Sequence, residues 1–175
     1  MEKILIILVL FAVTAGCMNK QEQEQRAPDK PQQDLSRADL IKLIATNDSL
    51  NLTGVCLQDI NLAGLDLKDA ILRRAHLRKA NLPYAFLSNA DFKNADLRNA
   101  DLRNADLSYS NLRYANLYRA FLQEADLRYV DFRGSDLRHA HFEGADLSYA
   151  NFNGADLKET KLDSAITKNT KGLKR

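Results

Sequence analysis

The chain repeats every five residues over most of its length. A large apolar residue stands at every fifth position from Leu57 to Leu162, which makes 22 repeats; 18 of these centres are Leu and four are Phe. A small residue, most often Ala, stands two positions before most centres, with exceptions such as Ile60 and Leu65, and Asp or Asn fills most of the positions in between. Any fold for this chain therefore has to bury two residues in each repeat, at positions two apart.

This five-residue period fits neither an α-helix nor a long strand. Five helical residues advance by ~500°, so the apolar residues would spiral around the axis and form no stripe. A strand needs a period of two, which the spacing breaks in every repeat. A short strand can point a centre and its small residue to the same side, and a turn must then follow. One short side and one corner per repeat give a coil with four sides, and stacked coils form a solenoid.

The residues expected at the corners support this interpretation. The position two residues after a centre often holds Gly or Asn, as at Gly64, Gly134, Gly144, Gly154, Asn89, Asn94, Asn99 and Asn104. Both residue types tolerate the positive φ that tight turns require. Asp or Asn before each centre can accept hydrogen bonds from nearby backbone N–H groups. We therefore expect these carboxylates to be structural rather than catalytic.

The repeat resembles the A(D/N)Lxx motif of the pentapeptide-repeat family, most clearly in ADLRNADLRNADL at residues 95–107. The resemblance covers residues 55–164 and implies that family's fold, a right-handed quadrilateral β-helix. The 22 repeats make 5.5 coils. We therefore predict an all-β solenoid of about 5–6 coils over residues 47–164.

Both ends of the predicted rod carry distinct segments. Residues 36–46, SRADLIKLIAT, are predicted to form a short capping helix with Ser36 as its N-cap and Leu40 and Leu43 on one face. Residues 165–175 contain four basic residues and no acid, and we predict a basic tail there. Such a tail can contact an anionic surface or be solvated.

The N-terminus resembles a bacterial lipoprotein signal. Residues 1–16 contain an apolar run shorter than the ~20 residues that span a bilayer, and small residues precede Cys17. The resemblance implies that the signal peptide is removed and that Cys17 carries lipid, which anchors the protein to a membrane. An uncleaved short anchor or an ordinary signal is the alternative. If Cys17 carries lipid, Cys56 is expected to be a lone packed thiol, because the chain has only two cysteines; an intermolecular bridge is the alternative.

The predicted localisation is therefore an exported, membrane-anchored one, on the periplasmic side of the outer or inner membrane or at the cell surface. Residues 17–35 are rich in Gln and charge and include two prolines. Such a composition cannot bury enough apolar surface to fold alone, so we expect a disordered tether between the anchor and the rod.

Residues 20 apart should stack on one side of the rod, which predicts three outward ladders. The ladders consist of Arg78, Arg98, Tyr118, Arg138 and Lys158; of Arg73, Lys93, Arg113 and Arg133; and of Tyr109, Tyr129 and Tyr149. The basic ladders are candidates for binding a protein or an anionic polymer, and the tyrosines for an amphipathic contact. In the alternative interpretation, arginines interleave with neighbouring aspartates and keep the rod soluble, and the tyrosines shield the coil edge.

Charge and motifs exclude several functional classes. The net charge of +2, and of −1 over residues 55–164, does not indicate nucleic-acid binding. We find no catalytic constellation, no cofactor motif and no third ligand beside His139 and His141. The predicted function is a non-enzymatic, lipid-anchored envelope scaffold. The alternative comes from family members that mimic DNA and protect type II topoisomerases; those are strongly acidic, whereas this chain alternates its charges.

Overall fold

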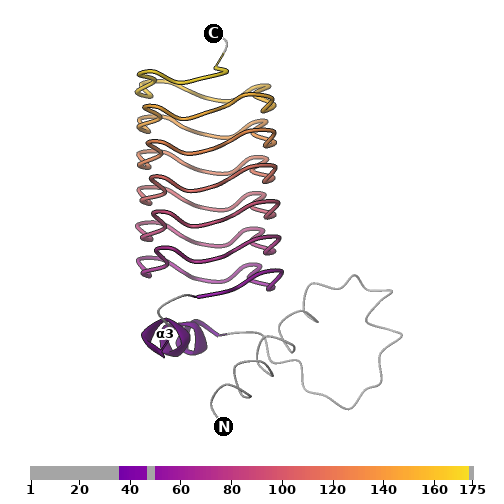
Figure 1. Ribbon diagram of the computed structural model, residues 1–175, viewed down its shortest axis with the longest axis vertical. Helices are drawn as coiled ribbons and strands as arrows, with labels where there is room; N and C mark the ends of the chain where they lie inside the picture. The colour runs from indigo at the N-terminus through magenta and orange to yellow at the C-terminus, as the bar shows by residue number, and fades with distance from the viewer. Residues whose placement is uncertain (1–35, 47–49, 174–175) are drawn as a thin grey trace, which may run out of the picture.

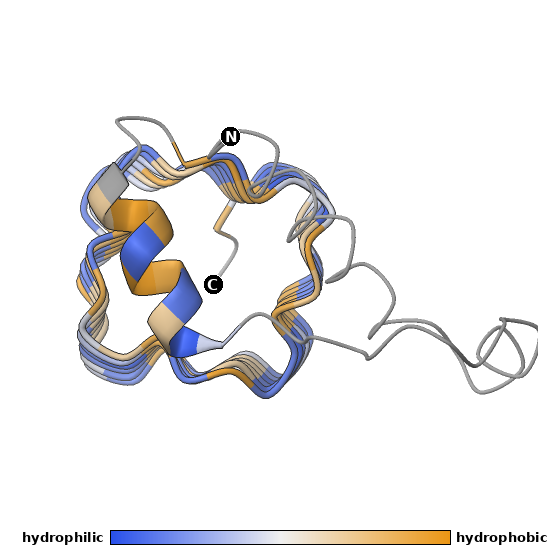
Figure 2. Cartoon of the chain, turned by 90° about the horizontal axis from the view of Figure 1, so that it is seen from below, coloured by the Kyte–Doolittle hydropathy of each residue, from blue (hydrophilic) through white to orange (hydrophobic). Residues whose placement is uncertain are grey.

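The computed structural model describes residues 36–46, without the side chain of Thr46, and residues 50–173. Residues 50–173 form a rod of stacked coils, each roughly square in cross-section (Figures 1 and 2). Parallel β-bridges join each residue before a centre to the residue 20 positions later, from Asn51 and Ile71 to Asn151 and Lys171. These bridges span six coils. The predicted all-β solenoid is confirmed.

Backbone hydrogen bonds hold each coil to the next in the same way at nearly every repeat. In the repeat centred on Leu97, the Leu97 N–H donates to the Asn116 carbonyl at 2.8 Å. The N–H of Asp96 donates to the Ala75 carbonyl, in the preceding coil, at 2.9 Å. A turn closes each corner, where the Ala100 N–H donates to the Leu97 carbonyl at 3.0 Å. Most backbone polar groups of the inner coils are thus satisfied although no strand is longer than a single bridge.

The interior is filled by the centres and the small residues, as the period predicts. Leu97, Leu102 and Leu107 are 0% exposed, and Ala95, Ala100 and Ala105 are at most 1% exposed. Figure 2 shows this apolar lining on the inner side of the coils. Larger centres stack where they are 20 residues apart: the rings of Phe132 and Phe152 lie 4.9 Å apart. The core is therefore a set of columns that run along the rod.

Every corner has the same backbone conformation, whatever residue occupies it. The residue two after each centre has a positive φ, between 55° and 64° at 19 positions other than glycine. Asn94 and Asn99 accept this left-handed conformation readily, but tyrosine and arginine at the same position cost roughly 1–2 kcal/mol each. Gly and Asn therefore mark corners correctly in the sequence, but they do not mark all of them.

Helix α3, Arg37–Thr46, covers the N-terminal end of the rod (Figures 1 and 2). Ser36 caps it as predicted, because its Oγ accepts a hydrogen bond from the Asp39 N–H at 3.2 Å. Leu40 is 0% exposed and Leu43 8%. The Arg37 guanidinium donates to two carbonyls of the first coil, those of Asn61 at 3.0 Å and Ala63 at 2.8 Å. The helix thus covers both apolar core and open backbone groups.

The C-terminal boundary predicted at residue 164 is wrong. Ile166 and Lys171 form bridges with Asp146 and Asn151, so residues 165–171 complete the last coil instead of forming a tail. Their backbone N–H groups donate to the Ala145 and Ala150 carbonyls at 2.9 Å. These bonds need no apolar side chain, which explains why the coil continues after the apolar pattern has ended. Lys174 and Arg175 lie outside the described residues.

The predicted signal peptide at residues 1–16, the lipidation site Cys17 and the tether at residues 17–35 also lie outside the described residues. Within residues 36–46 and 50–173, no helix has the length and apolar character needed to cross a bilayer. Cys56 lies on the outside of the first coil and is disulfide-bonded. The expectation of a lone thiol at this position is therefore wrong.

Candidate functional site

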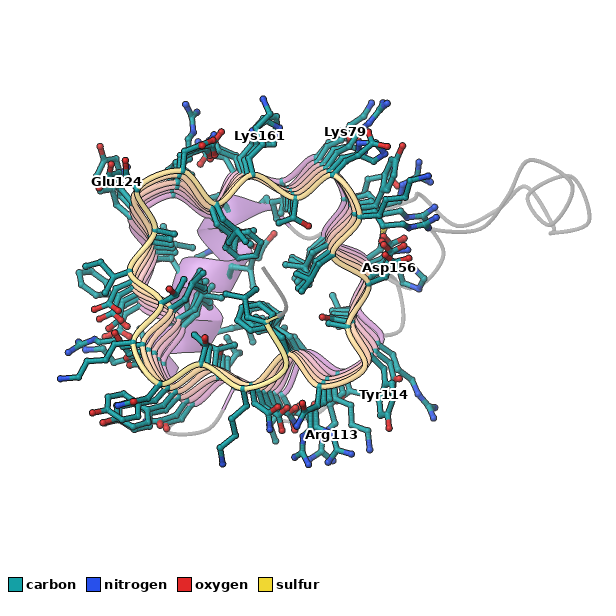
Figure 3. All side chains as sticks on the ribbon, turned by 90° about the horizontal axis from the view of Figure 1, so that it is seen from above. Lys79, Arg113, Tyr114, Glu124, Asp156 and Lys161 are labelled. Atoms are coloured by element: carbon teal, nitrogen blue, oxygen red, sulfur yellow. The ribbon has the colours of Figure 1, made fainter. Side chains whose placement is uncertain are left out.

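Two adjacent sides of the rod carry the predicted ladders. The tyrosine side runs through the bridging residues Asp91, Asn111, Asp131 and Asn151, and the arginine side runs through His76, Asp96, Asn116, Asp136 and Asp156. On each side a short outward column of bridging residues lies between two columns of corner residues. In Figure 3, Arg113 and Tyr114 mark the corner that the two sides share, and Asp156 marks the middle of the arginine side.

Tyr109, Tyr129 and Tyr149 form a continuous stack at one edge of the tyrosine side. The rings of Tyr109 and Tyr129 lie 4.7 Å apart and are inclined by 5°, and those of Tyr129 and Tyr149 lie 4.8 Å apart and are inclined by 3°. The three residues remain 60%, 45% and 42% exposed. The predicted ladder is therefore formed, and it presents ring edges and hydroxyl groups to the outside because the ring faces cover one another.

The backbone conformation at these three tyrosines is strained. Their φ angles are 61°, 61° and 64°, in the left-handed region where a bulky side chain is strained. Each stacked pair contributes about 0.5–1.5 kcal/mol in addition to the burial of the ring faces, which offsets part of the strain. Asparagine at the same position, as at Asn89 one coil earlier, avoids that strain. Because the three rings are held in one orientation and remain exposed, they are candidates for a contact.

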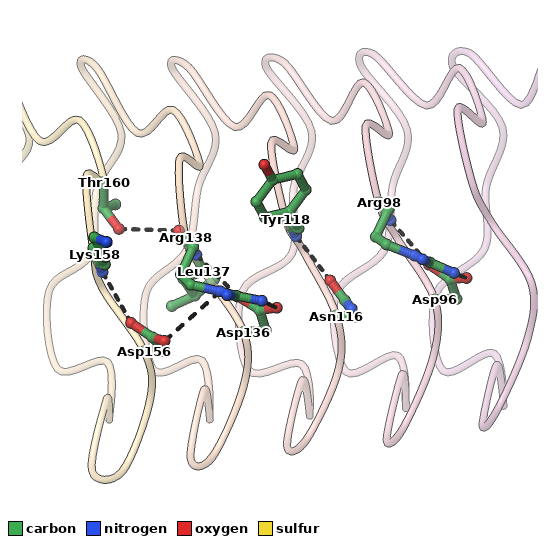
Figure 4. Close-up of polar contacts among 10 residues, drawn as sticks. All are labelled: Asp96, Arg98, Asn116, Tyr118, Asp136, Leu137, Arg138, Asp156, Lys158 and Thr160. Carbon is green, nitrogen blue, oxygen red and sulfur yellow. Dashed lines mark hydrogen bonds and ion pairs between the residues drawn. The ribbon is translucent and has the colours of Figure 1, made fainter.

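Most of the ladder arginines are already paired with aspartate. In the repeated motif Asp-Leu-Arg, the guanidinium folds back over the centre and holds the carboxylate with two hydrogen bonds. Arg138 binds Asp136 in this way at 2.8 and 2.7 Å (Figure 4). The same geometry joins Arg98 to Asp96, Arg103 to Asp101, Arg128 to Asp126 and Arg133 to Asp131. For these residues, the ion pairing that the interleaved-charge interpretation predicts is present.

The pairs lower the pKa of the carboxyl groups. At Asp101, Asp126 and Asp136 the largest cause is the hydrogen bond from the arginine side chain, which outweighs the opposite effect of burial on the pKa. The backbone N–H two residues later also donates to each carboxylate. These groups are therefore held ionised in the folded rod at a pH where they would begin to protonate in the unfolded chain.

We therefore expect the rod to lose stability below about pH 4. A carboxyl whose pKa is lowered by folding contributes stability that is complete above its ordinary pKa of 3.8 and is lost as the pH falls through the folded-state value. A variant with Asp101→Asn, Asp126→Asn and Asp136→Asn should show a smaller drop in melting temperature between about pH 4 and pH 2. The matched control, Asp59→Asn, Asp69→Asn and Asp163→Asn, should keep the full drop; equal drops in both variants would contradict this account.

Three ladder members have no carboxylate partner within the described residues: Arg78, Lys93 and Arg113. Arg78 and Arg113 follow His76 and Asn111, which stand where other repeats have Asp. Lys93 follows Asp91, but that carboxylate binds Arg73 of the preceding coil at 2.5 Å. Arg113 Nε is buried without a hydrogen-bond partner, and its guanidinium lies 5.5 Å from the centre of the Tyr114 ring. These three cations are the ladder members that form no ion pair among the described residues, while Asp96 attracts Arg78 and Asp131 attracts Arg113 over a longer distance.

The tyrosine stack and one basic column border the same side. Tyr109 and Arg113 lie at the two ends of the short segment 110–112, and the next coil repeats this arrangement with Tyr129 and Arg133. The ladder of Arg78, Arg98 and Arg138 lies on the arginine side, at the corner away from Arg113 and Tyr114. In these two consecutive coils the tyrosine side thus presents ring edges, then an amide or a carboxylate, then a guanidinium; at the level of Tyr149 the cation position holds Asn153.

The predicted ladders leave out exposed residues that lie next to Arg78. Arg74, His76 and Lys79 surround Arg78, and all are exposed. The signal was in the sequence, because residues 70–90 contain no acid. In the part of the chain that the structure describes, no three His, Cys, Asp or Glu side chains come together as a metal site. His139 and His141 instead contact Glu159 and Glu143, at 3.1 and 3.2 Å.

Comparisons with known structures identify similar coils. A crystal structure of the pentapeptide repeat protein Rfr23 from the cyanobacterium Cyanothece 51142 is 29% identical, covers 63% of this chain and 90% of its own, and has a TM-score of 0.61. A pentapeptide repeat protein from the thylakoid lumen of Arabidopsis thaliana is 32% identical, with coverages of 66% and 73% and a TM-score of 0.45.

QnrB1, a plasmid-mediated fluoroquinolone resistance protein, is 21% identical over 70% of this chain and 73% of its own, with a TM-score of 0.37. At that level of similarity it carries no functional argument, and the topoisomerase alternative stays a prediction. No curated protein matches the chain.

A family model agrees with the coils seen in the structure. The model for pentapeptide repeats matches in eight copies, which include residues 50–82, 70–108, 85–123, 105–144 and 125–163. Those matches together cover most of the rod, and the five-residue spacing, the left-handed corners and the stacked coils all follow from the same repeat. The chain therefore belongs to the pentapeptide-repeat family.

Proposed function

We propose that this protein is a non-enzymatic scaffold, anchored in the cell envelope by lipid on Cys17, which offers the tyrosine side of its rod to a partner. The anchor rests on the sequence alone, on the apolar run and small residues that precede Cys17. The partner is a protein or an envelope polymer. No bound cofactor is needed, because recognition by side chains that recur along a rod requires no chemistry.

The observation that carries this proposal is the exposed stack of Tyr109, Tyr129 and Tyr149 beside Arg113, which forms no ion pair among the described residues. Tyrosine supplies a large contact area with few rotatable bonds, so ordering it at an interface costs little entropy. The rings are already fixed by stacking at 4.7 and 4.8 Å. Arg113 adds a guanidinium whose Nε has no partner to lose. A surface of this kind is preorganised for binding.

Photocrosslinking in the native envelope tests the proposal directly. A benzophenone amino acid at Tyr129 should capture one discrete partner. The matched control places the same probe at Arg119, which occupies the same corner position with a φ of 56° but lies at the diagonally opposite corner of that coil. We expect a product from position 129 and none from position 119. No product at position 129, or the same products at both positions, would refute the tyrosine side as the contact.

A further inference from the structure

One coil differs from all others in its charge. The coil of residues 71–90 carries Arg73, Arg74, Arg78 and Lys79 and no acid, whereas every other coil between residues 51 and 170 mixes acids with bases. The four cations lie within seven consecutive residues. The two repeats that hold them lack an aspartate of their own, because Ile71 and His76 occupy the position where Asp supplies the ion pair elsewhere.

These cations form a row across the arginine side. Arg74, His76 and Arg78 occupy its three outward columns at this level, and Arg73 and Lys79 stand at the corners beyond them. Figure 3 shows Lys79 pointing outward from its corner. All five side chains are exposed. We call Arg73, Arg74, His76, Arg78 and Lys79 the basic row.

Nearby carboxylates leave most of the basic row uncompensated. Asp91 binds Arg73, and Asp96, in the coil above His76, is held by two hydrogen bonds from Arg98. Among the described residues, Arg74, Arg78 and Lys79 have no ion-pair partner. In the coil below, Gly54 stands under Arg74, and a Cβ added to it would meet no atom within 4 Å. Asp59 of the same coil stands under Lys79, so on that side the row is open to an anion at Arg74.

The position of the row points to the membrane. It lies in the second coil from the end that α3 covers (Figure 1), and in the sequence Cys17 precedes the first residue of α3 by 20 positions. We propose that the basic row contacts the phosphate headgroups of anionic phospholipids. This inference rests on the membrane anchor of the proposed function, because the anchor keeps the row within reach of the surface. The row then sets the orientation of the rod relative to the membrane and therefore which sides of the rod remain accessible to a partner.

The magnitude suits such an orienting contact. A basic residue near an anionic surface contributes about 1 kcal/mol, so the three cations of the row without an ion pair predict a preference for anionic over neutral lipid of roughly 150-fold. The attraction falls off within a Debye length of ~8 Å at physiological salt. A contact made only by the row would be too weak to replace an anchor in salt, but it is sufficient to orient a rod that is already attached.

Protection of arginines from phenylglyoxal tests the proposal on the full-length wild-type protein. The protein is reconstituted in vesicles of phosphatidylcholine, with or without phosphatidylglycerol, and modification of each arginine is measured by mass spectrometry. We expect phosphatidylglycerol to slow modification of Arg74 and Arg78 about tenfold, and high salt to reverse this effect. Arg119 is the internal control, because it is exposed, lacks a carboxylate partner and lies two coils further from α3. Its rate should stay unchanged.

The outcomes separate this inference from the proposed function. Flotation of the protein with phosphatidylcholine vesicles reports the anchor alone, so its loss would refute the anchor and not the row. Equal modification of Arg74 and Arg78 in both kinds of vesicle, with the protein still attached, would overturn the inference. Equal protection by inorganic phosphate without vesicles would also overturn it, because the row would then be a site for small anions. Protection of Arg119 to the same degree would show non-specific adsorption and would refute the row.

Discussion

Leu107→Asp is expected to unfold the β-helix. Leu107 is 0% exposed and lies in the middle of the rod, so the new carboxylate would be buried without a partner. Together with the lost apolar contact, the expected cost is about 5 kcal/mol or more, which is comparable to the whole stability of an ordinary domain. The break would also spread, because each coil is stabilised only by its neighbours. Circular dichroism and thermal melting of the purified protein measure the effect.

The matched control for this experiment is Asn104→Asp. It introduces the same charge three residues away, at an exposed corner with a φ of 58°, a conformation that aspartate tolerates. We expect its melting temperature to stay close to that of the wild type. A melting curve that Leu107→Asp leaves unmoved would refute the inward position of the centres, and equal losses in the two variants would indicate a general effect of charge.

Cys17→Ser is expected to release the protein from the membrane almost completely. A serine hydroxyl cannot form the thioether that carries the diacylglycerol, and the anchoring free energy of ~0.8 kcal/mol per buried CH₂ group is lost with the chains. Membrane and soluble fractions of cells that express the variant give the result. Cys56→Ser is the matched control, because it replaces the other cysteine of the chain and leaves the proposed lipid site intact. Retention of Cys17→Ser in the membrane fraction would overturn the lipid anchor.

The intact mass of the mature protein adds a second, independent measurement. The chain has two cysteines, and Cys56 is disulfide-bonded in the structure. A sulfur that carries lipid cannot also join a disulfide, so lipid on Cys17 and a bond between Cys17 and Cys56 exclude one another in a single chain. We expect a mass that begins at Cys17 and includes the added lipid. A mass without lipid that falls by two hydrogens on oxidation would refute the proposal.

Much of the fold could be predicted from the sequence because its information is local. The inward position of a centre such as Leu97 and its small partner Ala95 is set by the spacing within one repeat, and the same arrangement recurs coil after coil. Ser36 with Asp39 three residues later likewise marks the N-cap of α3 within a single helical turn. The C-terminal boundary was mispredicted for the complementary reason. Residues 165–171 are held by backbone hydrogen bonds to the preceding coil, which leave no pattern in the side chains.

The positions of the ladder residues could be predicted from the sequence, but the ion pairs that these residues form could not. A spacing of 20 residues places Arg78, Arg98 and Arg138 in one column, and this register is correct. The spacing alone does not show that the last two are held by aspartates within their own repeats, or that Arg73 reaches Asp91 in the next coil. Pairing of this kind depends on side-chain reach across a corner, which the periodicity does not encode.

The period, the four-sided coil, the inward residues and the capping helix can thus all be predicted from the sequence, because hydrophobic burial and turn chemistry act within a few residues. The pairing of the cations, the stacking of the tyrosine rings and the position of the tyrosine and Arg113 columns on one side are seen only in the folded rod. Those features depend on atoms brought together from repeats that are one coil apart. Coil-to-coil packing therefore separates the arginines that stabilise the rod from those left free to bind.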